Sequence, residues 1–267
     1  MNSPRISASS YSNTAPLVWS FLYGQNHGRV ELILDNAPAR SAELLAQDRV
    51  DAALVPVIAY QMLDGVRLIP DVCVGAKERV RSVCLVTRGE DLENVRSVSL
   101  DTSSRTSVVL TKLIFREFLG REPAFISAKP DIDEMLAVSD CALLIGDPAL
   151  RLSNSISEIS NLKYFDLAEL WHSHTGLGFV FAMWMTRRDR VSIDFAAARD
   201  EGLEHIGEIA ANYETDIDLG SDEMRTYLTQ NISYSIDDSM KRGLELYFDL
   251  AAKHDLIDRV KEMQFLS

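Results

Sequence analysis

Runs typical of strands and runs typical of helices alternate along this chain, and they do so in two separate series. The first series opens with "RISAS" at residues 5–9, followed by a helical run at 15–24 and a second strand at 30–35. The second series opens near residue 95 with "VRSVSLD" and continues into a long helical run. Strands that alternate with helices form parallel sheets covered by helices, so the pattern predicts an α/β protein with two similar units.

Three further extended runs indicate how the units are connected. Residues 67–75 and 80–88 separate the two series, and residues 177–187 form a late apolar run typical of a returning strand. We therefore expect two lobes joined by two extended crossings, with a ligand cleft between them and an entirely helical C-terminal part. The expected first lobe comprises residues 1–88 and 186–267, and the second comprises residues 89–185.

Charge and hydropathy limit the possible partners. The 267 residues carry a formal net charge of −13, and such an acidic protein repels phosphate backbones, which argues against nucleic acid. The apolar runs are shorter than the ~18 residues of a membrane helix, and the first ten residues lack the apolar core of a secretion signal. We therefore expect a cytoplasmic protein without membrane contact.

The cysteines and histidines give little support for a metal centre. Cys73, Cys84 and Cys141 lie in apolar runs without CxxC spacing, so we interpret them as reduced core residues. His172 and His174 are two residues apart and cannot share one face of a helix. We expect no metal, and we interpret both histidines as surface or capping residues.

A polar segment, "SSYSNTAP" at residues 9–16, follows the first expected strand and opens the first helix. The free N–H groups of a helix start, together with Ser, Asn and Thr side chains, can bind an anion or a carbonyl group. We expect ligand contacts from Tyr11, Asn13 and Thr14. The alternative is ordinary capping by Asn13 or Thr14, with Pro16 in the first turn, but capping explains one of these polar residues rather than all of them.

A second polar segment, residues 100–110, also lies between a strand and a helix. Hydroxyls and N–H groups at a helix start suit a carboxylate, and an arginine adds a cation. The alternative is a capped helix with the arginine on the surface. The ligand contacts expected here come from Ser104, Arg105, Thr106 and Ser107.

Three more places complete the candidate site. Gly146 allows a ligand to approach the backbone after the strand "CALLI", and Asp147 beside it is explained equally well by helix capping. Ser82 is a polar residue within an apolar crossing strand, so it either faces the cleft or is hydrogen-bonded in the core. Thr175 and Gly176 come just before the returning strand and are further candidates for ligand contact.

Five segments in order resemble a known enzyme family. They lie between residues 8 and 184 and read "ASSYSNTAPLVW", "DAALVPV", "SVSLDTSSRTSVVL", "CALLIGDPAL" and "TGLGFVFAMW". Together with the helical "GLELYFDLAAKHDLI", they make nearly the whole chain similar to the chorismate dehydratase family of menaquinone biosynthesis by the futalosine route. The sequence departs from the family pattern at Ser12, where an apolar residue is usual, and at Val57, which is commonly Ser.

The resemblance implies a two-lobed fold like that of type II periplasmic binding proteins. It implies a cofactor-free hydro-lyase that removes water from chorismate, a small dianion, to give 3-[(1-carboxyvinyl)oxy]benzoate. By motif, it implies that Asn13 and Ser82 are the catalytic residues. The matching elements "SSRTS" and "IGD" contain Ser104 to Ser107, Gly146 and Asp147.

The identity of the base stays open. Asp147 is the nearest side-chain candidate, but a carboxylate that caps a helix has a depressed pKa and is a weak base. The enolpyruvyl carboxylate of the substrate could take the proton instead, with Asn13 on that carboxylate or on the leaving hydroxyl. Two rival functions are a 1,4-dihydroxy-6-naphthoate synthase type of enzyme, which tends to have a His at the position of Gly146 or Asp147, and a non-enzymatic binding protein for a small anion.

Overall fold

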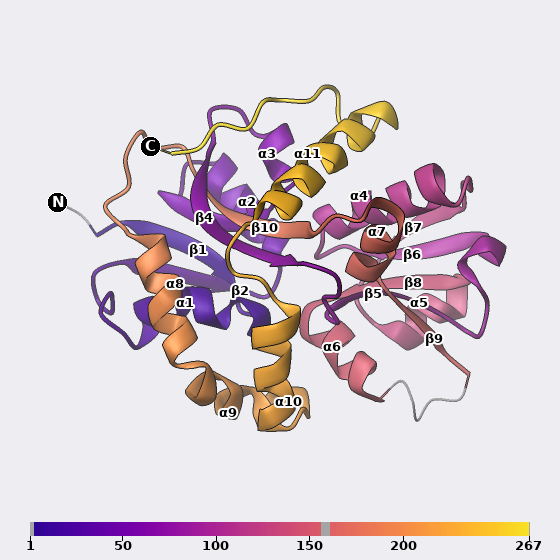
Figure 1. Ribbon diagram of the computed structural model, residues 1–267, viewed down its shortest axis with the longest axis horizontal. Helices are drawn as coiled ribbons and strands as arrows, with labels where there is room; N and C mark the ends of the chain where they lie inside the picture. The colour runs from indigo at the N-terminus through magenta and orange to yellow at the C-terminus, as the bar shows by residue number, and fades with distance from the viewer. Residues whose placement is uncertain (1–2, 156–160, 267) are drawn as a thin grey trace.

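Two five-stranded sheets lie side by side in the computed structural model, which describes residues 3–155 and 161–266 (Figure 1). The strand order is β2-β1-β3-β10-β4 in the first sheet and β7-β6-β8-β5-β9 in the second. The strands of the first sheet are β1 (Arg5–Ser9), β2 (Glu31–Asp35), β3 (Ala52–Pro56), β4 (Arg67–Ala76) and β10 (Phe179–Thr186). Those of the second are β5 (Val83–Thr87), β6 (Ser97–Asp101), β7 (Ala124–Ala128), β8 (Cys141–Ile145) and β9 (Lys163–Asp166).

Each sheet combines parallel and antiparallel pairs in the same way. β1 pairs in parallel with β2 and β3, and β6 pairs in parallel with β7 and β8. β10 then runs antiparallel to β3 and β4, and β5 runs antiparallel to β8 and β9. Parallel neighbours need crossover connections, which the helices between them supply. The α/β class predicted from the alternation is confirmed.

Helices follow the strands, and three of them begin at the sheet edges that face the other half of the molecule. These are α1 (Ala15–Leu22) after β1, α4 (Thr106–Leu113) after β6, and α6 (Gly146–Ser155) after β8. A 3₁₀ turn, η1 (Ser12–Thr14), precedes α1, and a π-helical segment, η3 (Ile114–Phe118), extends α4. The other elements in this part of the chain are α2 (Pro38–Ala46), α3 (Ala59–Met62), η2 (Leu92–Asn94), α5 (Ile132–Val138) and α7 (Leu167–Thr175).

Helix α1 is enclosed on all sides, which explains its apolar sequence. Residues 15–21 are all buried, with α8 (Phe195–Glu204) packed against them. The contact is close because Gly202 has no side chain: a Cβ atom there would lie 1.8 Å from the carbonyl oxygen of Pro16. Only glycine fits at this crossing, so Gly202 fixes the distance between the two helices.

The C-terminal part is mostly, but not entirely, helical. After α8 come α9 (Ile206–Ile217), α10 (Ser221–Thr226), the π-helical η5 (Tyr227–Asn231) and α11 (Asp238–Lys253). Residues 254–266 leave the helical state, and Phe265 forms a bridge with Leu68 beside β4. The expectation of an entirely helical end is therefore wrong for this tail, because the edge strand β4 offers it backbone hydrogen bonds from outside.

The strand pairing moves the expected lobe boundaries. The expected divisions at 88/89 and 185/186 assign β5 to the first lobe and β10 to the second, but β5 pairs in the second sheet and β10 in the first. The sequence gives strand character without naming the hydrogen-bond partner, so the expected divisions do not follow the two sheets at β5 and β10. We propose two lobes built on the two sheets, with crossings at residues 77–82 and 176–178.

One hydrophobic core cluster extends through both sheets, and a smaller cluster covers the outer face of the second. Cys73, Cys84 and Cys141 are buried and free, as predicted. No helix within the described ranges is long and apolar enough to cross a membrane.

Candidate functional site

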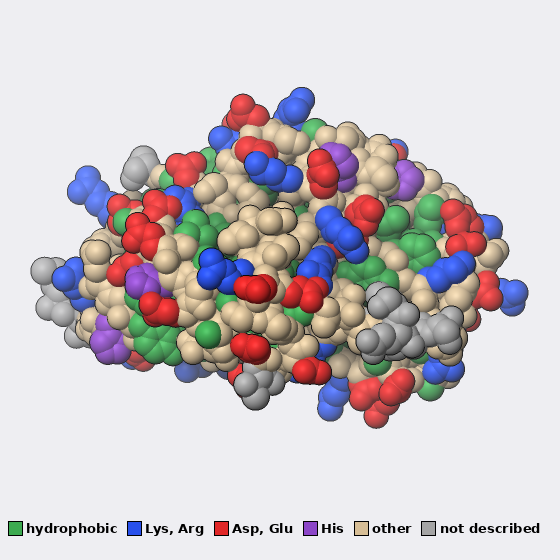
Figure 2. Space-filling model, turned by 60° about the horizontal axis from the view of Figure 1, so that its bottom comes forward, with side chains coloured by type: hydrophobic (Ala, Val, Ile, Leu, Met, Phe, Trp, Pro, Cys, Tyr) green, Lys and Arg blue, Asp and Glu red, His purple; other side chains and the backbone are tan. Residues whose placement is uncertain are grey.

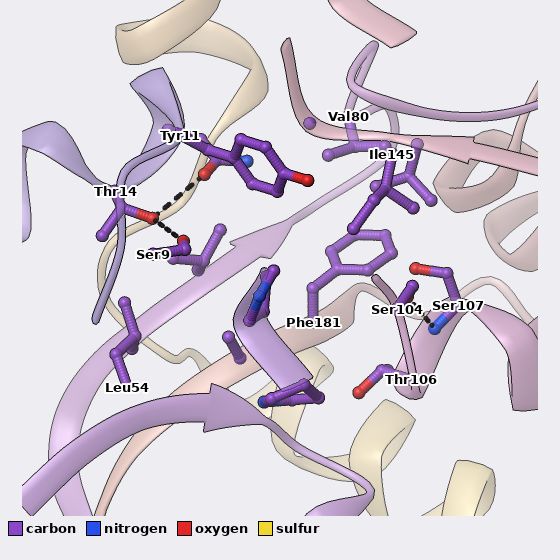
Figure 3. Close-up of a pocket in the computed structure, with 17 residues that line it drawn as sticks. Ser9, Tyr11, Thr14, Leu54, Val80, Ser104, Thr106, Ser107, Ile145 and Phe181 are labelled. Carbon is purple, nitrogen blue, oxygen red and sulfur yellow. Dashed lines mark hydrogen bonds between the residues drawn. The ribbon is translucent and has the colours of Figure 1, made fainter. Parts of the chain in front are cut away.

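A cavity of about 60 Å³ lies between the two sheets and is lined from both (Figure 3). The first sheet and its helices contribute Ser9, Tyr11, Asn13 and Thr14, with Leu54, Pro56 and Phe181 below them. The second contributes Ser104, Thr106, Ser107, Ile145 and Gly146. The ends of β1, β6 and β8 thus meet at one place, as expected for parallel strands whose carboxyl ends converge.

The first polar segment forms a chain of hydrogen bonds beside the cavity. The Oγ1 atom of Thr14 donates to Oδ1 of Asn13 at 3.2 Å, so the Ser9 hydroxyl must donate to Thr14 at 2.9 Å. Within residues 3–155, neither η1 nor α1 receives a side-chain cap. Capping therefore does not account for Asn13 or Thr14, and the amide nitrogen of Asn13 is left to donate to a ligand.

The second polar segment is hydrogen-bonded to the first turn of its own helix and also lines the cavity. Oγ of Ser104 accepts the N–H of Ser107 at 3.1 Å, and Oγ1 of Thr106 accepts the N–H of Ile58 at 3.4 Å. Arg105 lies outside the cavity lining, where Nη2 is 3.7 Å from Oε1 of Glu43 on α2. Ser104 therefore bonds within the first turn of α4, and ligand contacts from Ser104 and Arg105 stay predictions.

Gly146, at the start of α6, lies against the ring of Tyr11 from the first polar segment. Its φ of 65° is left-handed, and a Cβ atom there would meet the ring of Tyr11 at 2.7 Å. A side chain at this position would strain the backbone and displace Tyr11 from the cavity.

Asp147 links the two sheets instead of capping its own helix. Its carboxylate accepts the Ser12 hydroxyl at 2.6 Å and the Ser12 N–H at 3.1 Å. Burial raises the pKa of Asp147, against the opposing effect of the hydrogen bonds from Ser12. The depressed pKa that capping would give is therefore not found, and the carboxylate is occupied by Ser12 outside the cavity lining.

Ser82 lies behind the cavity rather than in its lining. It is completely buried, its carbonyl oxygen accepts the N–H of Gly146 at 2.7 Å, and its hydroxyl has one long contact of 3.5 Å with the Val80 carbonyl. Val80 and Val83 on either side of it line the cavity. Ser82 itself lies just before β5 and does not contribute to that lining.

Thr175 and Gly176 are placed away from the cavity, at the end of α7. The Thr175 hydroxyl donates to the Trp171 carbonyl at 2.8 Å, and Gly176 ends the helix with a φ of 68°. Both residue types are explained by helix termination, which is a local signal that imitates a binding turn.

Two residues of this region carry polar atoms that the sequence did not single out. Asp101 is fully buried at the end of β6, burial raises its pKa, and its Oδ2 atom has no hydrogen-bond partner among the described residues. Tyr227, on η5, likewise has an unpartnered hydroxyl within that part of the chain. Asp101 could have been suspected, because it directly precedes "TSSRTS"; Tyr227 could not, because its segment has no polar motif.

The electrostatics of the cavity depend on neutral donors. Its polar lining consists of hydroxyls, one amide and helix-start N–H groups, and the described residues contain no cluster of His, Cys, Asp and Glu that could hold a metal ion. Figure 2 shows acidic and basic side chains intermingled over the face that it presents. Such a cavity can bind carboxylates and orient a polar molecule without a metal.

A second hollow, of about 620 Å³, lies on the other side of Tyr11. Trp19, Arg151 and Tyr213 line it together with the carboxylates Asp147 and Asp216. Two carboxylates against one arginine make this hollow less suited to a dianion than the cavity between the sheets.

Two mixed sheets, two crossings and a cavity between them define a protein with the periplasmic-binding-protein fold. Protein AF1704 of Archaeoglobus fulgidus superimposes with a TM-score of 0.70 at 16% identity, covering 95% of this chain and 98% of that one. The Candida albicans CA3427 product, described as having the generic periplasmic binding protein fold, gives a TM-score of 0.65 at 12% identity over 99% and 98% of the two chains. The aliphatic sulphonate binding protein SsuA of Escherichia coli superimposes with a TM-score of 0.62 at 13% identity, covering 99% of this chain and 93% of that one. At these identities the likeness shows the fold alone.

Sequence similarity narrows this class to one family. A family described as menaquinone biosynthesis matches residues 4–253. A chorismate dehydratase of Thermus thermophilus is 30% identical over 257 residues, which cover 89% of this chain and 91% of that protein. The chain belongs to this menaquinone biosynthesis family, and the resemblance read from its motifs is confirmed.

Proposed function

We propose that this protein is a chorismate dehydratase that supplies 3-[(1-carboxyvinyl)oxy]benzoate to menaquinone biosynthesis by the futalosine route. The observation that carries the proposal is the cavity between the sheets, whose hydroxyls, amide and helix starts come from both lobes. The identity with the Thermus thermophilus chorismate dehydratase supports it. A cytoplasmic location belongs to the same proposal, because that relative is a biosynthetic enzyme.

Chorismate has the chemistry that such a cavity fits. It carries two carboxylates and a C4 hydroxyl, and its C3 proton is acidified through a double bond by the ring carboxylate. In the proposed reaction the C3–H bond breaks, its electron pair forms the C3–C4 double bond, and the C4 oxygen leaves with a proton as water. Because the ring becomes aromatic, the protein mainly has to hold one conformation and stabilise developing charge.

The two polar segments would divide this work. The helix start at Ser104, Thr106 and Ser107 would hold one carboxylate with N–H groups and hydroxyls. The Asn13 amide nitrogen would donate to the leaving hydroxyl or to the enolpyruvyl carboxylate, which is positioned to take the C3 proton. Asp147 is a poor candidate for the base, since Ser12 occupies its carboxylate.

The size of the cavity implies a movement. Ligand pockets usually measure a few hundred Å³, and the space between the sheets is about 60 Å³. Binding of chorismate therefore requires the lobes to open at the crossings, which would break the Ser12–Asp147 contact or lengthen it.

Incubation of the purified protein with chorismate, followed by chromatography with mass detection, tests the function. A new product lighter by one water, absent with heat-inactivated protein, is expected. Unchanged chorismate with a ligand-induced melting shift would favour a small-anion binding protein, and unchanged chorismate without a shift would favour another substrate, as for a 1,4-dihydroxy-6-naphthoate synthase type of enzyme.

A further inference from the structure

Tyr227 carries a buried hydroxyl without a hydrogen-bond partner. The side chain is 0% exposed, and within residues 3–155 and 161–266 its oxygen forms no hydrogen bond. Leaving a hydroxyl unpaired in a protein interior is costly, and most buried polar atoms are paired. The residue that replaces it most simply, Phe, would avoid this cost, so the hydroxyl needs an explanation beyond packing.

Two residues expected to be catalytic, Asn13 beside α1 and Ser82 in the crossing at 77–82, lie near this hydroxyl. Burial raises the pKa of Tyr227, while the side chains of Ser82 and Asn13 lie close enough to lower it in part. Neither of them completes a hydrogen bond with it. The hydroxyl thus lies between two groups whose own bonding is incomplete: Ser82 has its 3.5 Å contact with Val80, and Asn13 has an unused amide nitrogen among the described residues.

Tyr227 also lies where the lobes are tied together. Arg81, next to Ser82, donates from Nη2 to Oε1 of Glu223 on α10 at 2.7 Å, one turn before Tyr227. In Figure 1, α10 lies beside α6, close to the crossings between the lobes. A movement of the crossing that carries Ser82 is therefore coupled to the helix that carries Tyr227.

We propose that Tyr227 is a positioning residue for the dehydration, whose hydroxyl joins Asn13 to Ser82 when the lobes close on the substrate. The phenol oxygen accepts one hydrogen of the Asn13 amide nitrogen, and the phenol hydrogen is donated to Oγ of Ser82. The second hydrogen of the Asn13 amide then points to the substrate. This inference rests on the proposed function, since the substrate is what brings Asn13 and Ser82 to the phenol.

Tyr234 provides a matched control. It is buried to a similar degree, and its hydroxyl also lacks a partner among the described residues. Its ionisable neighbours are Tyr227 and Tyr213, and neither Asn13 nor Ser82 influences its hydroxyl. Removing the Tyr234 hydroxyl therefore tests the effect of deleting an unpaired buried hydroxyl as such.

Comparison of Tyr227→Phe with Tyr234→Phe tests the proposal. Both variants are expected to melt at or above the wild-type temperature, because each loses an unpaired buried polar atom. Tyr227→Phe is expected to lower kcat for chorismate about tenfold, the kinetic equivalent of one hydrogen bond, with KM within about twofold. An unchanged kcat in Tyr227→Phe, or an equal loss in Tyr234→Phe, would overturn the assignment.

A double-mutant cycle tests the route through Ser82. If Tyr227 acts through Ser82, Tyr227→Phe should have little further effect on kcat in a Ser82→Ala background. If the double variant instead loses kcat by the product of the two single losses, Tyr227 does not act through Ser82.

A measurement without turnover separates this proposal from the proposed function. In amide-labelled protein, Tyr227→Phe is expected to shift the side-chain NMR signal of Asn13 in the presence of chorismate, and Tyr234→Phe is not. If wild-type protein leaves chorismate unchanged while this shift is seen, the dehydratase function fails and only the contact between Tyr227 and Asn13 stands. An unmoved Asn13 signal would overturn the positioning role whatever the activity.

Discussion

The two polar segments at the cavity, residues 9–16 and 100–110, occupy equivalent places in their sheets but use their hydroxyls differently. In the second segment, the Ser104 hydroxyl accepts the N–H of Ser107 in the first turn of α4 and Ser103 bonds Asp101, so the chain is held by local contacts. In the first, no side chain of residues 3–155 caps η1 or α1. There, the hydroxyl of Ser12 is taken by Asp147 of the other lobe.

This difference suggests a division of roles. A helix start that is fixed by local hydrogen bonds presents the same donors whether the lobes are open or closed, which suits the binding of a carboxylate. A segment held through the other lobe changes its surroundings when the lobes move, which suits a group that acts only in the closed complex. We therefore assign binding to the Ser104 segment and chemistry to the Asn13 segment.

Asn13→Ala should give the largest effect. Loss of a donor at developing charge is expected to lower kcat by about 10²- to 10³-fold, while the intact Ser104 segment keeps chorismate binding near the wild-type level. Ser10→Ala is the control, because that hydroxyl donates at 3.2 Å to Asn36 outside the cavity. Single-turnover kinetics measures the rate at which bound chorismate reacts. A wild-type rate in Asn13→Ala would show that Asn13 takes no part in the reaction.

Gly146→Ala tests the contact between the first segment, through Tyr11, and the start of α6. The left-handed backbone alone should cost about 1–2 kcal/mol of unfolding free energy, and the Tyr11 ring adds a collision. Gly120→Ala has a similar φ of 62° with open space around the new Cβ atom, so it isolates the backbone cost. Denaturant unfolding should show a larger loss of unfolding free energy in Gly146→Ala than in Gly120→Ala. Equal losses would mean that the Tyr11 ring moves aside at no cost.

Ser107→Ala addresses the binding side of the comparison. Removal of one hydroxyl that donates to a carboxylate is expected to raise KM about tenfold and leave kcat within about twofold. Thr102→Ala, at an exposed position of the same segment, should change neither. A fall in kcat without a rise in KM would reverse the roles assigned to the two segments.

The smallest effect concerns Asp147 and pH. Because burial raises the pKa of Asp147 in the folded protein, the folded state takes up its proton more readily than the unfolded state. The stability that this group contributes is fully present below the ordinary carboxyl pKa and is lost as the pH rises through the raised value. Melting temperatures of wild type and Asp147→Asn should therefore differ most in favour of wild type at acid pH. A difference that grows towards neutral pH would show that the charged carboxylate is the stabilised form.

The sequence predicted those features of the fold that depend on local pattern. The alternation of runs predicted the α/β class, and the polar segments before α1, α4 and α6 were located because hydroxyl clusters at helix starts are visible in the chain itself. The sheets that contain β5 and β10 were not predicted, since hydrogen-bond partners are set by tertiary packing rather than by local pattern.

In the candidate site, too, the features visible in the local sequence were predicted and those that depend on tertiary contacts were not. Asn13, Ser104 and Thr106 were predicted at the ligand and lie in the cavity lining, but their roles at a ligand stay predictions. Asp147 could not be recognised as a link to Ser12, because the contact joins residues 135 positions apart. Tyr227 could not be recognised at all, since an aromatic residue in a helical stripe is usually core, and it is distinguished by an unpartnered oxygen near Asn13 and Ser82.

The most direct test of the account is a crystal structure of the Asn13→Ala variant, in which turnover should be slow, with chorismate bound. We expect density between the sheets, with one carboxylate on the N–H groups and hydroxyls of Ser104 to Ser107 and either the C4 hydroxyl or the enolpyruvyl carboxylate facing position 13. Chorismate bound instead in the hollow beside Trp19 and Arg151, or with both carboxylates away from the Ser104 segment, would contradict the division of binding and chemistry between the two segments.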